Sequence, residues 1–398
     1  MATTATTPAT TPAPPARGPW VIVTGDFTPL GGMDRCNHAL ACYLARRRGA
    51  EVHLVTHRAW PDLLALPGVH LHQVPRPFGR HMLGYPLLDH AGRHWARRLS
   101  KGGARVVVNG GNCRWHDINW VHYVHAAWTR RQDGGPARRL KAALLRRYDE
   151  AAERASIGRS RLVVANSERT RRDVIEHLGV PPERVHTVYL GTDPARFGPI
   201  GPAERARSRA KLGWDDDRPT VAFVGALADV RKGFDTLFEA WRRLASASSW
   251  DARLAVVGAG GSLPYWKAKA ADAGLGGSIE FLGFRDDVPE VLAACDALAS
   301  PVRYEPFGLN VQEALCRGLP ALVTATAGVA ERYPAELAGL LLPDPDDAAD
   351  LADRLRDWRG RLEGYRAAVA PLGAALRGWD WDRCAAAIVD LAEAQGAP

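Results

Sequence analysis

The sequence predicts an α/β protein made of two Rossmann-like, doubly wound domains of parallel sheet that face each other across a cleft. Two series of short runs rich in Val, Ile and Leu alternate with longer helical segments, which is typical of strands buried on both faces. The length of 398 residues accommodates two such domains. There is no run of about 18 uncharged apolar residues, so we expect no membrane-spanning helix.

The first series predicts an N-terminal domain over residues 20–195. Its strands are expected at 20–25, 51–56, 69–74, 104–109, 118–125, 161–166 and 185–190. Residues 1–19, rich in Thr, Ala and Pro, precede this domain. Because this stretch lacks both an apolar core and the pattern of a secretion signal, we expect a disordered tail.

The second series predicts a C-terminal domain over residues 219–378. Its strands are expected at 220–226, 252–258, 278–284, 297–302, 320–325 and 339–343. The segment 196–218 between the domains shows no clear periodicity and is interpreted as a hinge. Residues 379–398 contain an amphipathic helix that could cross back to the N-terminal domain. Ligands are expected at the carboxyl ends of the strands, in the crevice between the domains.

Positive charge is concentrated in the N-terminal half. The net charge is +8, yet residues 1–200 hold 29 Lys and Arg against 15 Asp and Glu. This asymmetry indicates an anionic partner, such as a phosphate, a membrane surface or a nucleic acid. The segment 129–150 carries seven cations and is interpreted either as a solvated helix face or as contact with an anionic membrane or phosphate-linked acceptor. No aromatic residues are interleaved to stack on bases, so we expect no nucleic acid partner.

The six cysteines are scattered and form no C-x-x-C pair. This pattern argues against a zinc site or a disulfide framework and favours the reducing cytoplasm. The predicted location is therefore cytoplasmic, and if segment 129–150 contacts an anionic membrane, that contact is peripheral and at the inner face. A polybasic segment without a long apolar face is expected to rest on such a surface rather than insert deeply.

The segment 303–320, RYEPFGLNVQEALCRGLP, carries the strongest local signal for a binding site. A helix beginning near Gly308 and Leu309 would direct unpaired backbone N–H groups from residues 307–309, including Phe307, toward a diphosphate. Glu305 precedes this helix, and Glu313 lies within it, where a carboxylate can accept hydrogen bonds from two ribose hydroxyls. Two solvated glutamates on an amphipathic helix are the alternative interpretation.

With Pro-Phe-Gly after the first Glu and Gly-Leu-Pro after the helix, this segment resembles the E-x7-E signature of GT-B glycosyltransferases. In particular it is similar to the large retaining family 4, also called group 1, and the resemblance extends from about residue 20 to residue 395. It implies that the C-terminal domain holds a nucleotide sugar and that the N-terminal domain brings the acceptor. It also implies transfer on one face of the sugar without a metal, with Glu305 positioning the sugar hydroxyls.

Residues 223–241 resemble the strand, loop and helix with which this family holds the donor diphosphate. Lys232, before Gly233, matches the family's lysine, whereas Ala226 stands at the position of the family's arginine. Arg231 could replace that arginine or could be a solvated neighbour. Phe284 is expected near the base of the nucleotide.

Two further positions are expected to line the site by the same resemblance. Gly31 and Gly32 resemble a first-domain loop that lets the backbone approach donor phosphate or acceptor, although a plain tight turn has the same composition. The family places a histidine near the donor sugar, and strand alternation over 118–125 favours His125, at the carboxyl end, over His122. Either histidine could instead belong to the core.

The sequence thus predicts a hexosyl-type transferase that moves a sugar from a nucleoside diphosphate to an acceptor hydroxyl with retention. The predicted catalytic residues are His125, Lys232 and Glu305, and no cofactor or metal is expected. The acceptor is expected to be a carbohydrate, a lipid-linked molecule or a small molecule. The alternatives are a sugar-nucleotide epimerase or phosphorylase with the same architecture, or a catalytically silent nucleotide-sugar-binding protein.

Overall fold

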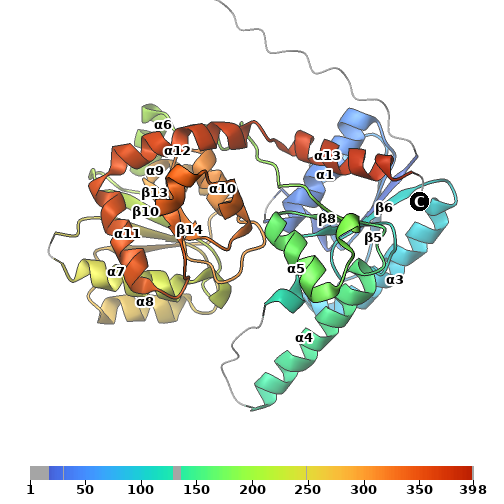
Figure 1. Cartoon of the computed structure of the whole chain (residues 1–398), viewed down its shortest axis with the longest axis horizontal. Coiled ribbons are helices and arrows are strands. Elements are labelled where there is room, and N and C mark those ends of the chain that lie inside the picture. Colours follow the sequence, from blue (N-terminus) through green and yellow to red (C-terminus); the bar gives the residue numbers. More distant parts are fainter. Residues whose placement is uncertain (1–17, 30, 129–135, 248, 397–398) are drawn as a thin grey trace, which may run out of the picture. The chain divides into compact units, whose positions relative to one another are not determined.

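The computed structural model describes residues 18–29, 31–128, 136–247 and 249–396. The chain forms two compact units (Figure 1). The first unit contains residues 1–120, 132–164 and 385–398, and the second contains 121–131 and 165–384. The expected disordered tail lies outside the described residues up to residue 17. No helix among the described residues is long and apolar enough to span a bilayer.

A parallel sheet organises the N-terminal half of the chain, in the order β5-β3-β1-β6-β7-β8-β9. All seven strands fall within the predicted runs: β1 (Trp20–Val23), β3 (Val52–Thr56), β5 (Val69–Gln73), β6 (Arg105–Val108), β7 (Ile118–Val121), β8 (Leu162–Ala165) and β9 (Val185–Thr187). β1 pairs in parallel with β3 and β6, so Trp20 lies opposite Val52 and Arg105. A separate parallel pair, β2 (Asp26–Phe27) and β4 (Arg58–Ala59), is too short to show in the sequence pattern.

The helices of the first unit pack against this sheet through buried aliphatic side chains. They are α1 (Met33–Arg48), α2 (Pro61–Leu64), α3 (His81–Ser100) and α4 (Pro136–Ile157). Val21, Val23 and Val106 form one core with Leu88 and Ala96 of α3. This face of the sheet is therefore covered by α3.

The C-terminal end of the chain completes the first unit. Helix α13 (Trp381–Ala394) ends there, where Arg48 makes two hydrogen bonds of 2.8 and 3.0 Å to Glu393. Arg105 donates to the carbonyl oxygen of Ala392 at 2.6 Å. Residues from Ala385 onward belong to the first unit, whereas residues 379–384 belong to the second.

The second unit contains a six-stranded parallel sheet in the order β12-β11-β10-β13-β14-β15. The strands, again within the predicted runs, are β10 (Thr220–Val224), β11 (Arg253–Val257), β12 (Ile279–Gly283), β13 (Ala297–Ser300), β14 (Ala321–Thr324) and β15 (Leu341–Leu342). Helices lie on both of its sides (Figure 1). They are α7 (Phe234–Ala245), α8 (Leu263–Asp272), α9 (Val288–Ala294), α10 (Leu309–Cys316), α11 (Ala348–Gly360) and α12 (Leu362–Arg377). Helix α5 (Glu168–Leu178) is also assigned to the second unit, but it packs against β9.

The range expected to be a hinge, 196–218, contains a helix that is part of the second unit. Helix α6 (Pro202–Lys211) begins with a proline at its first position and packs against α9. Arg205 donates to both carboxylate oxygens of Asp296, at 2.9 and 3.1 Å. The whole range 196–218 lies within the segment 165–384 of the second unit. The sequence pattern does not reveal this helix, because its sequence is mainly polar and its buried residues are Ser208 and Arg209.

Candidate functional site

The loops of the second unit meet at the carboxyl edge of its sheet. Gly225 follows β10 and Gly258 follows β11, and a Cβ atom on Gly258 would lie only 2.0 Å from the carbonyl oxygen of Gly225. Phe284 follows β12 at the same edge, and its side chain is 75% exposed. The backbones of these neighbouring loops therefore approach as closely as glycine permits, at the edge where a parallel α/β sheet usually binds its ligand.

A short helical turn after β10 holds Lys232 in place. The turn η4 (Val230–Lys232) is capped by Asp229 and ends at Gly233, whose φ of +66° is left-handed. A Cβ atom on Gly233 would lie 1.8 Å from the carbonyl oxygen of Pro301, so the turn rests directly on the end of β13. This backbone contact fixes the position of the turn that carries Lys232.

Lys232 and Glu305, two of the predicted catalytic residues, form an ion pair. The Lys232 Nζ atom lies 2.5 Å from Oε2 of Glu305, and the two side chains are 25% and 15% exposed. The residues are 73 positions apart in sequence but meet because both loops leave the carboxyl edge of the sheet. An anion entering this edge would meet a lysine already held in position.

Arg231 is not a solvated neighbour. Its guanidinium makes hydrogen bonds of 2.6 to 3.1 Å to both carboxylate oxygens of Asp229 and lies 4.8 Å from the ring centre of Tyr123. Burial opposes the charge of Arg231, but the bonds to Asp229 outweigh it and raise the pKa of Arg231. Burial likewise favours the neutral form of Asp229, yet Arg231 holds the pKa of that carboxyl below its usual range. Sequence reasoning missed Asp229.

Helix α10 begins at this edge, where the sequence predicts it. Its N-cap is Gly308, with φ of +110°, and the first N–H groups bonded to the Gly308 carbonyl are those of Val311 and Gln312. The amides of Leu309 and Asn310 precede these bonds and belong to the positive end of the helix. The side chain of Asn310, which sequence reasoning missed, donates to the carbonyl oxygen of Val224 at 3.0 Å and ties the helix to β10.

Two other residues of the predicted segment 303–320, Phe307 and Glu313, are largely buried. The side chain of Phe307 is 2% exposed and belongs to the core, so only its backbone can contact a ligand. Glu313 lies in α10 and is 8% exposed. A carboxylate so enclosed is not one of two solvated glutamates on a helix surface.

Tyr304 anchors the segment that carries the two histidines. Its hydroxyl donates to Asp173 at 2.9 Å and accepts from the backbone N–H of Val124 at 3.4 Å. The ring packs edge-on against Tyr123, with centres 5.1 Å apart. Burial, followed by the Asp173 charge, raises the pKa of Tyr304. Neither Tyr304 nor Asp173 has a local sequence signal, because they meet across 131 residues.

The structure distinguishes the two histidines, although the strand argument behind the choice was wrong. Strand β7 ends at Val121, so alternation does not extend to His122 or His125. Burial lowers the pKa of His122 to about 3, which keeps its ring neutral. His125 begins the turn η2 (His125–Ala127), is exposed, and lies 4.7 Å from the ring of Tyr123. His125 is thus linked through Tyr123 to Arg231.

In the first unit, Gly31 and Gly32 precede α1, with Gly32 as its N-cap. Gly31 has φ of +83°, and no atom lies within 4 Å of a Cβ built on either residue. The loop is therefore open on its outer side. Asp34, in the first turn of α1, was missed by sequence reasoning. Burial and then the neighbouring Asp26 raise its pKa to about 6.

Families of known proteins match both halves of this chain. The family model "Glycosyltransferase Family 4" matches residues 30–196, and "Glycosyl transferases group 1" matches residues 204–359. A D-inositol 3-phosphate glycosyltransferase from Xylanimonas cellulosilytica is 28% identical over 95% of this chain and 97% of its own length. Other curated relatives, 28% to 31% identical, are matched over only 54% to 58% of their length.

Solved structures share the whole fold. WaaG, a glycosyltransferase involved in lipopolysaccharide biosynthesis, has a TM-score of 0.73 and 23% identity over 94% of this chain and 99% of its own. HepE from Anabaena, solved in complex with UDP-glucose, has a TM-score of 0.70 and 20% identity over 95% of this chain and 100% of its own. The family matches and the fold define a glycosyltransferase of the GT-B type. The chain belongs to the group 1 glycosyltransferases.

Proposed function

We propose that this glycosyltransferase takes a sugar from a nucleoside diphosphate and transfers it to an acceptor hydroxyl with retention of configuration. The observation that carries the proposal is the Lys232–Glu305 pair beside the N-terminus of α10. A lysine and the amides at a helix N-terminus together suit a diphosphate. The complex of HepE with UDP-glucose supports a nucleotide sugar as donor.

In this proposal the donor opens the ion pair. The diphosphate competes with Glu305 for the Lys232 ammonium, and the released carboxylate accepts hydrogen bonds from sugar hydroxyls. As the bond between the anomeric carbon and the diphosphate breaks, negative charge grows on the leaving phosphate oxygen. Lys232 and the amides of α10 stabilise that charge without reorganising, which is the main catalytic contribution. The leaving oxygen takes the acceptor's proton, so no carboxylate nucleophile is required.

Glu313 is proposed to hold the donor ribose. Its carboxylate lies within α10, eight residues after Glu305, and is largely buried. A carboxylate can accept hydrogen bonds from two neighbouring hydroxyls at once. Arg231, which is already paired with Asp229, is proposed to add a second positive charge at the phosphate end.

A panel of nucleotide sugars tests this function. Each is screened by thermal shift, and those that stabilise the protein are assayed for release of nucleoside diphosphate with an added acceptor hydroxyl. We expect one base to be preferred, release without added metal, and a product whose anomeric configuration equals that of the donor. An inverted product, or no release with any nucleotide sugar, contradicts the proposal. Stabilisation without release would favour the silent binding protein instead.

We further propose that the first unit rests on an anionic membrane, at the cytoplasmic face. Exposed apolar side chains gather on α3 and α4: Met82 (53%), Leu83 (46%), Leu87 (40%), Leu140 (63%), Leu144 (59%) and Tyr148 (53%). Leu140, Leu144 and Tyr148 recur every four residues and share one helix face. Tyr85 of α3 interacts electrostatically with Tyr148, so the two helices are close.

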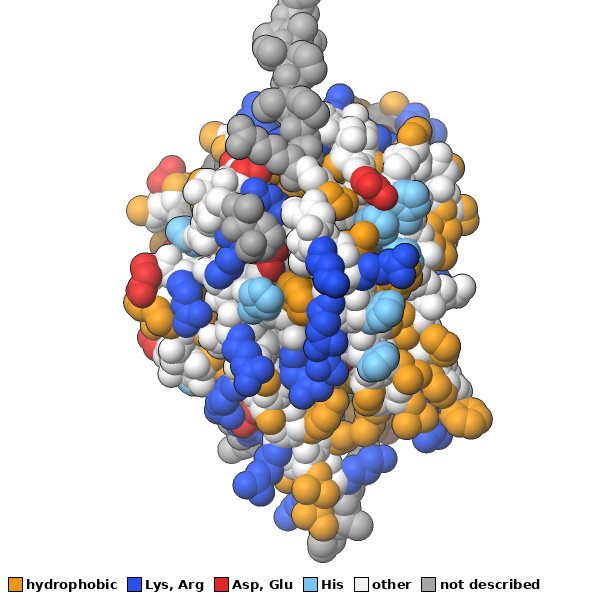
Figure 2. Space-filling model, turned by 90° about the vertical axis from the view of Figure 1, so that its right-hand side faces the viewer, with side chains coloured by type: hydrophobic (Ala, Val, Ile, Leu, Met, Phe, Trp, Pro, Cys, Tyr) orange, Lys and Arg blue, Asp and Glu red, His pale blue; other side chains and the backbone are white. Residues whose placement is uncertain are grey.

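Cations accompany this apolar surface. Arg139, Lys141 and Arg147 of α4 are exposed, and Figure 2 shows Lys and Arg side chains beside the hydrophobic ones on this side of the unit. An apolar patch with adjacent cations fits an anionic bilayer better than an uncharged one. The apolar face was not expected from the sequence. In this proposal its side chains insert into the bilayer, in addition to the electrostatic contact made by the cations. An acceptor carried by a lipid would then be within the plane of the membrane.

A further inference from the structure

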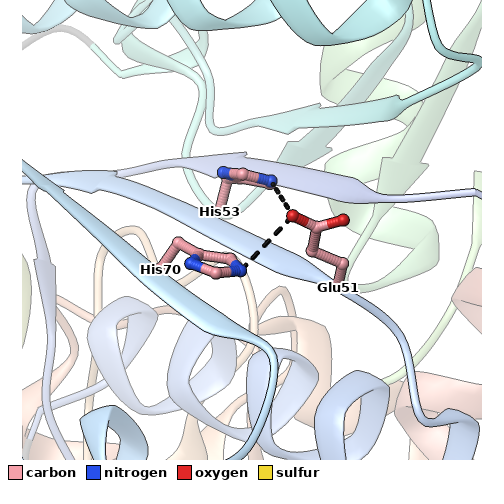
Figure 3. Close-up of side chains that lie close together, drawn as sticks. All are labelled: Glu51, His53 and His70. Carbon is pink, nitrogen blue, oxygen red and sulfur yellow. Dashed lines mark hydrogen bonds and ion pairs between the residues drawn. The ribbon is translucent and has the colours of Figure 1, made fainter.

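Two neighbouring strands of the first unit bring a carboxylate and two imidazoles together. Glu51 directly precedes β3, His53 lies within β3, and His70 lies opposite His53 on the edge strand β5. Because side chains two residues apart share one face of a strand, Glu51 and His53 project together. Figure 3 shows both imidazoles directed at the Glu51 carboxylate.

Two of the three distances within this cluster are close to those between the ligands of one metal ion. Oε1 of Glu51 lies 3.1 Å from Nε2 of His53 and 3.3 Å from Nε2 of His70. Zinc bonds of about 2.0–2.2 Å at tetrahedral angles place ligand atoms about 3.3–3.5 Å apart. All three donor atoms lie within 4.8 Å of one another, and rotation of the exposed His70 side chain can close the longest of these separations.

His72 supplies the outer support that metal-binding histidines have. Its Nε2 atom lies 2.9 Å from Nδ1 of His53, on the side of the ring away from Glu51. His72 is itself stacked on Trp95 of α3, with ring centres 3.5 Å apart. A partner on the second ring nitrogen fixes the orientation of a ligating histidine. His53, whose side chain is 8% exposed, is therefore a rigid ligand, and Nε2 is the atom that it presents.

We propose that Glu51, His53 and His70 bind one Zn²⁺ ion, with water in the fourth position. Two imidazoles and one carboxylate match the preference of zinc, whereas Mg²⁺ and Ca²⁺ prefer oxygen ligands alone. Entry is open, because Glu51 and His70 are 54% and 49% exposed. The expectation of no zinc site was based on cysteine spacing alone, and that spacing says nothing about histidine and carboxylate ligands on paired strands.

The ion would join β3 to the edge strand β5. The two strands pair over five residues, from Val52 with Val69 to Thr56 with Gln73. A metal held by side chains of both strands adds a cross-link that only the folded protein can make. Zinc binding therefore stabilises the first unit by mass action. The site contains none of the residues proposed for catalysis, so activity is not its readout.

Calorimetric titration of ZnCl2 into the metal-free full-length protein, without a histidine tag, tests the proposal. We expect one zinc ion per chain and a zinc-dependent rise in Tm. Glu51→Gln and His70→Ala should each weaken binding by at least about tenfold and abolish the rise in Tm. His177→Ala, an exposed histidine of α5 in the other unit, is the matched control and should bind zinc as the wild type does.

Further outcomes decide the remaining points. His72→Phe, which keeps a ring stacked on Trp95, should weaken zinc about 10- to 100-fold if His72 orients His53. Unchanged binding in that variant overturns the orienting role. Zinc binding of the same strength in Glu51→Gln and His70→Ala, or none at micromolar zinc, overturns the site itself. Circular dichroism of each variant separates loss of a ligand from loss of the fold.

Discussion

Lys232 is held in an ion pair with Glu305 in a partly buried environment, and this sets its expected role. Lys232→Ala should reduce kcat on the order of 100-fold, because an electrostatic donor to the leaving diphosphate is lost. The midpoint of unfolding should change little. Steady-state release of nucleoside diphosphate measures the effect, with the exposed Lys267→Ala as the matched control. A kcat near that of the wild type would mean that Arg231 or another group carries the phosphate.

Asp34 provides a pH-dependent test in the first unit. Its pKa is raised from 3.8 to about 6, by burial and then by Asp26, against the opposing charges of Arg58 and Arg76. The folded state therefore favours the protonated carboxyl, and stability from this group is lost as the pH rises through about 6. Asp34→Asn should be more stable than the wild type above pH 6, on the order of 1 kcal/mol after reduction for partial exposure.

Thermal unfolding of both proteins across about pH 4 to 8 measures this difference. The gain of Asp34→Asn over the wild type should grow between about pH 4 and pH 6 and then stay constant. A difference that does not change with pH would show that the carboxyl of Asp34 titrates normally.

At the scale of elements, Gly233 joins the turn η4 to helix α7 where no side chain fits. Gly233→Ala must place a Cβ atom 1.8 Å from a backbone oxygen at a left-handed φ, so the turn carrying Lys232 has to move. We expect a loss of at least about 2 kcal/mol in stability together with weaker donor binding. Chemical unfolding measures the loss of stability. Gly276→Ala is the control, because no atom lies within 4 Å of a Cβ built on Gly276. Equal effects of the two substitutions would contradict the close packing.

The strands could be predicted from sequence, but some boundaries and partners could not. Runs such as Val106–Val108 are buried on both faces, so composition alone reports them. The end of β7 at Val121 was missed because apolar residues continue into a segment held by Tyr304. The pairing of Lys232 with Glu305 was not predicted either, although each residue was identified in its own local motif. The hydrogen bond between Tyr304 and Asp173 joins residues far apart in the sequence, and no local pattern encodes such a contact.

At the scale of the whole molecule, the proposed membrane contact and the proposed donor site belong to different units. The cations and exposed leucines of α4 belong to the first unit, and the proposed donor site belongs to the second. We expect sedimentation with anionic vesicles at low salt that weakens as salt is added, with about 1 kcal/mol from each cation near the surface.

Two variants separate the contributions to this membrane contact. Arg139→Ser with Arg147→Ser should reduce binding mainly at low salt. Leu140→Ser with Leu144→Ser should remove the part of the binding that survives high salt, because that part depends on the apolar face. No sedimentation of the wild type with anionic vesicles at low salt would end the membrane proposal.

The central claim is that the edge of the second unit's sheet binds a nucleoside diphosphate through Lys232, α10 and Glu313. Calorimetric titration of the nucleoside diphosphate preferred in the donor screen into the wild type and Glu313→Gln tests it most directly. We predict one site, weakened in Glu313→Gln by about 1.5–3 kcal/mol because a charged acceptor of ribose hydroxyls is lost. Inorganic pyrophosphate, which has no ribose, should bind both proteins equally. Equal affinity of both proteins for the nucleoside diphosphate would contradict the account.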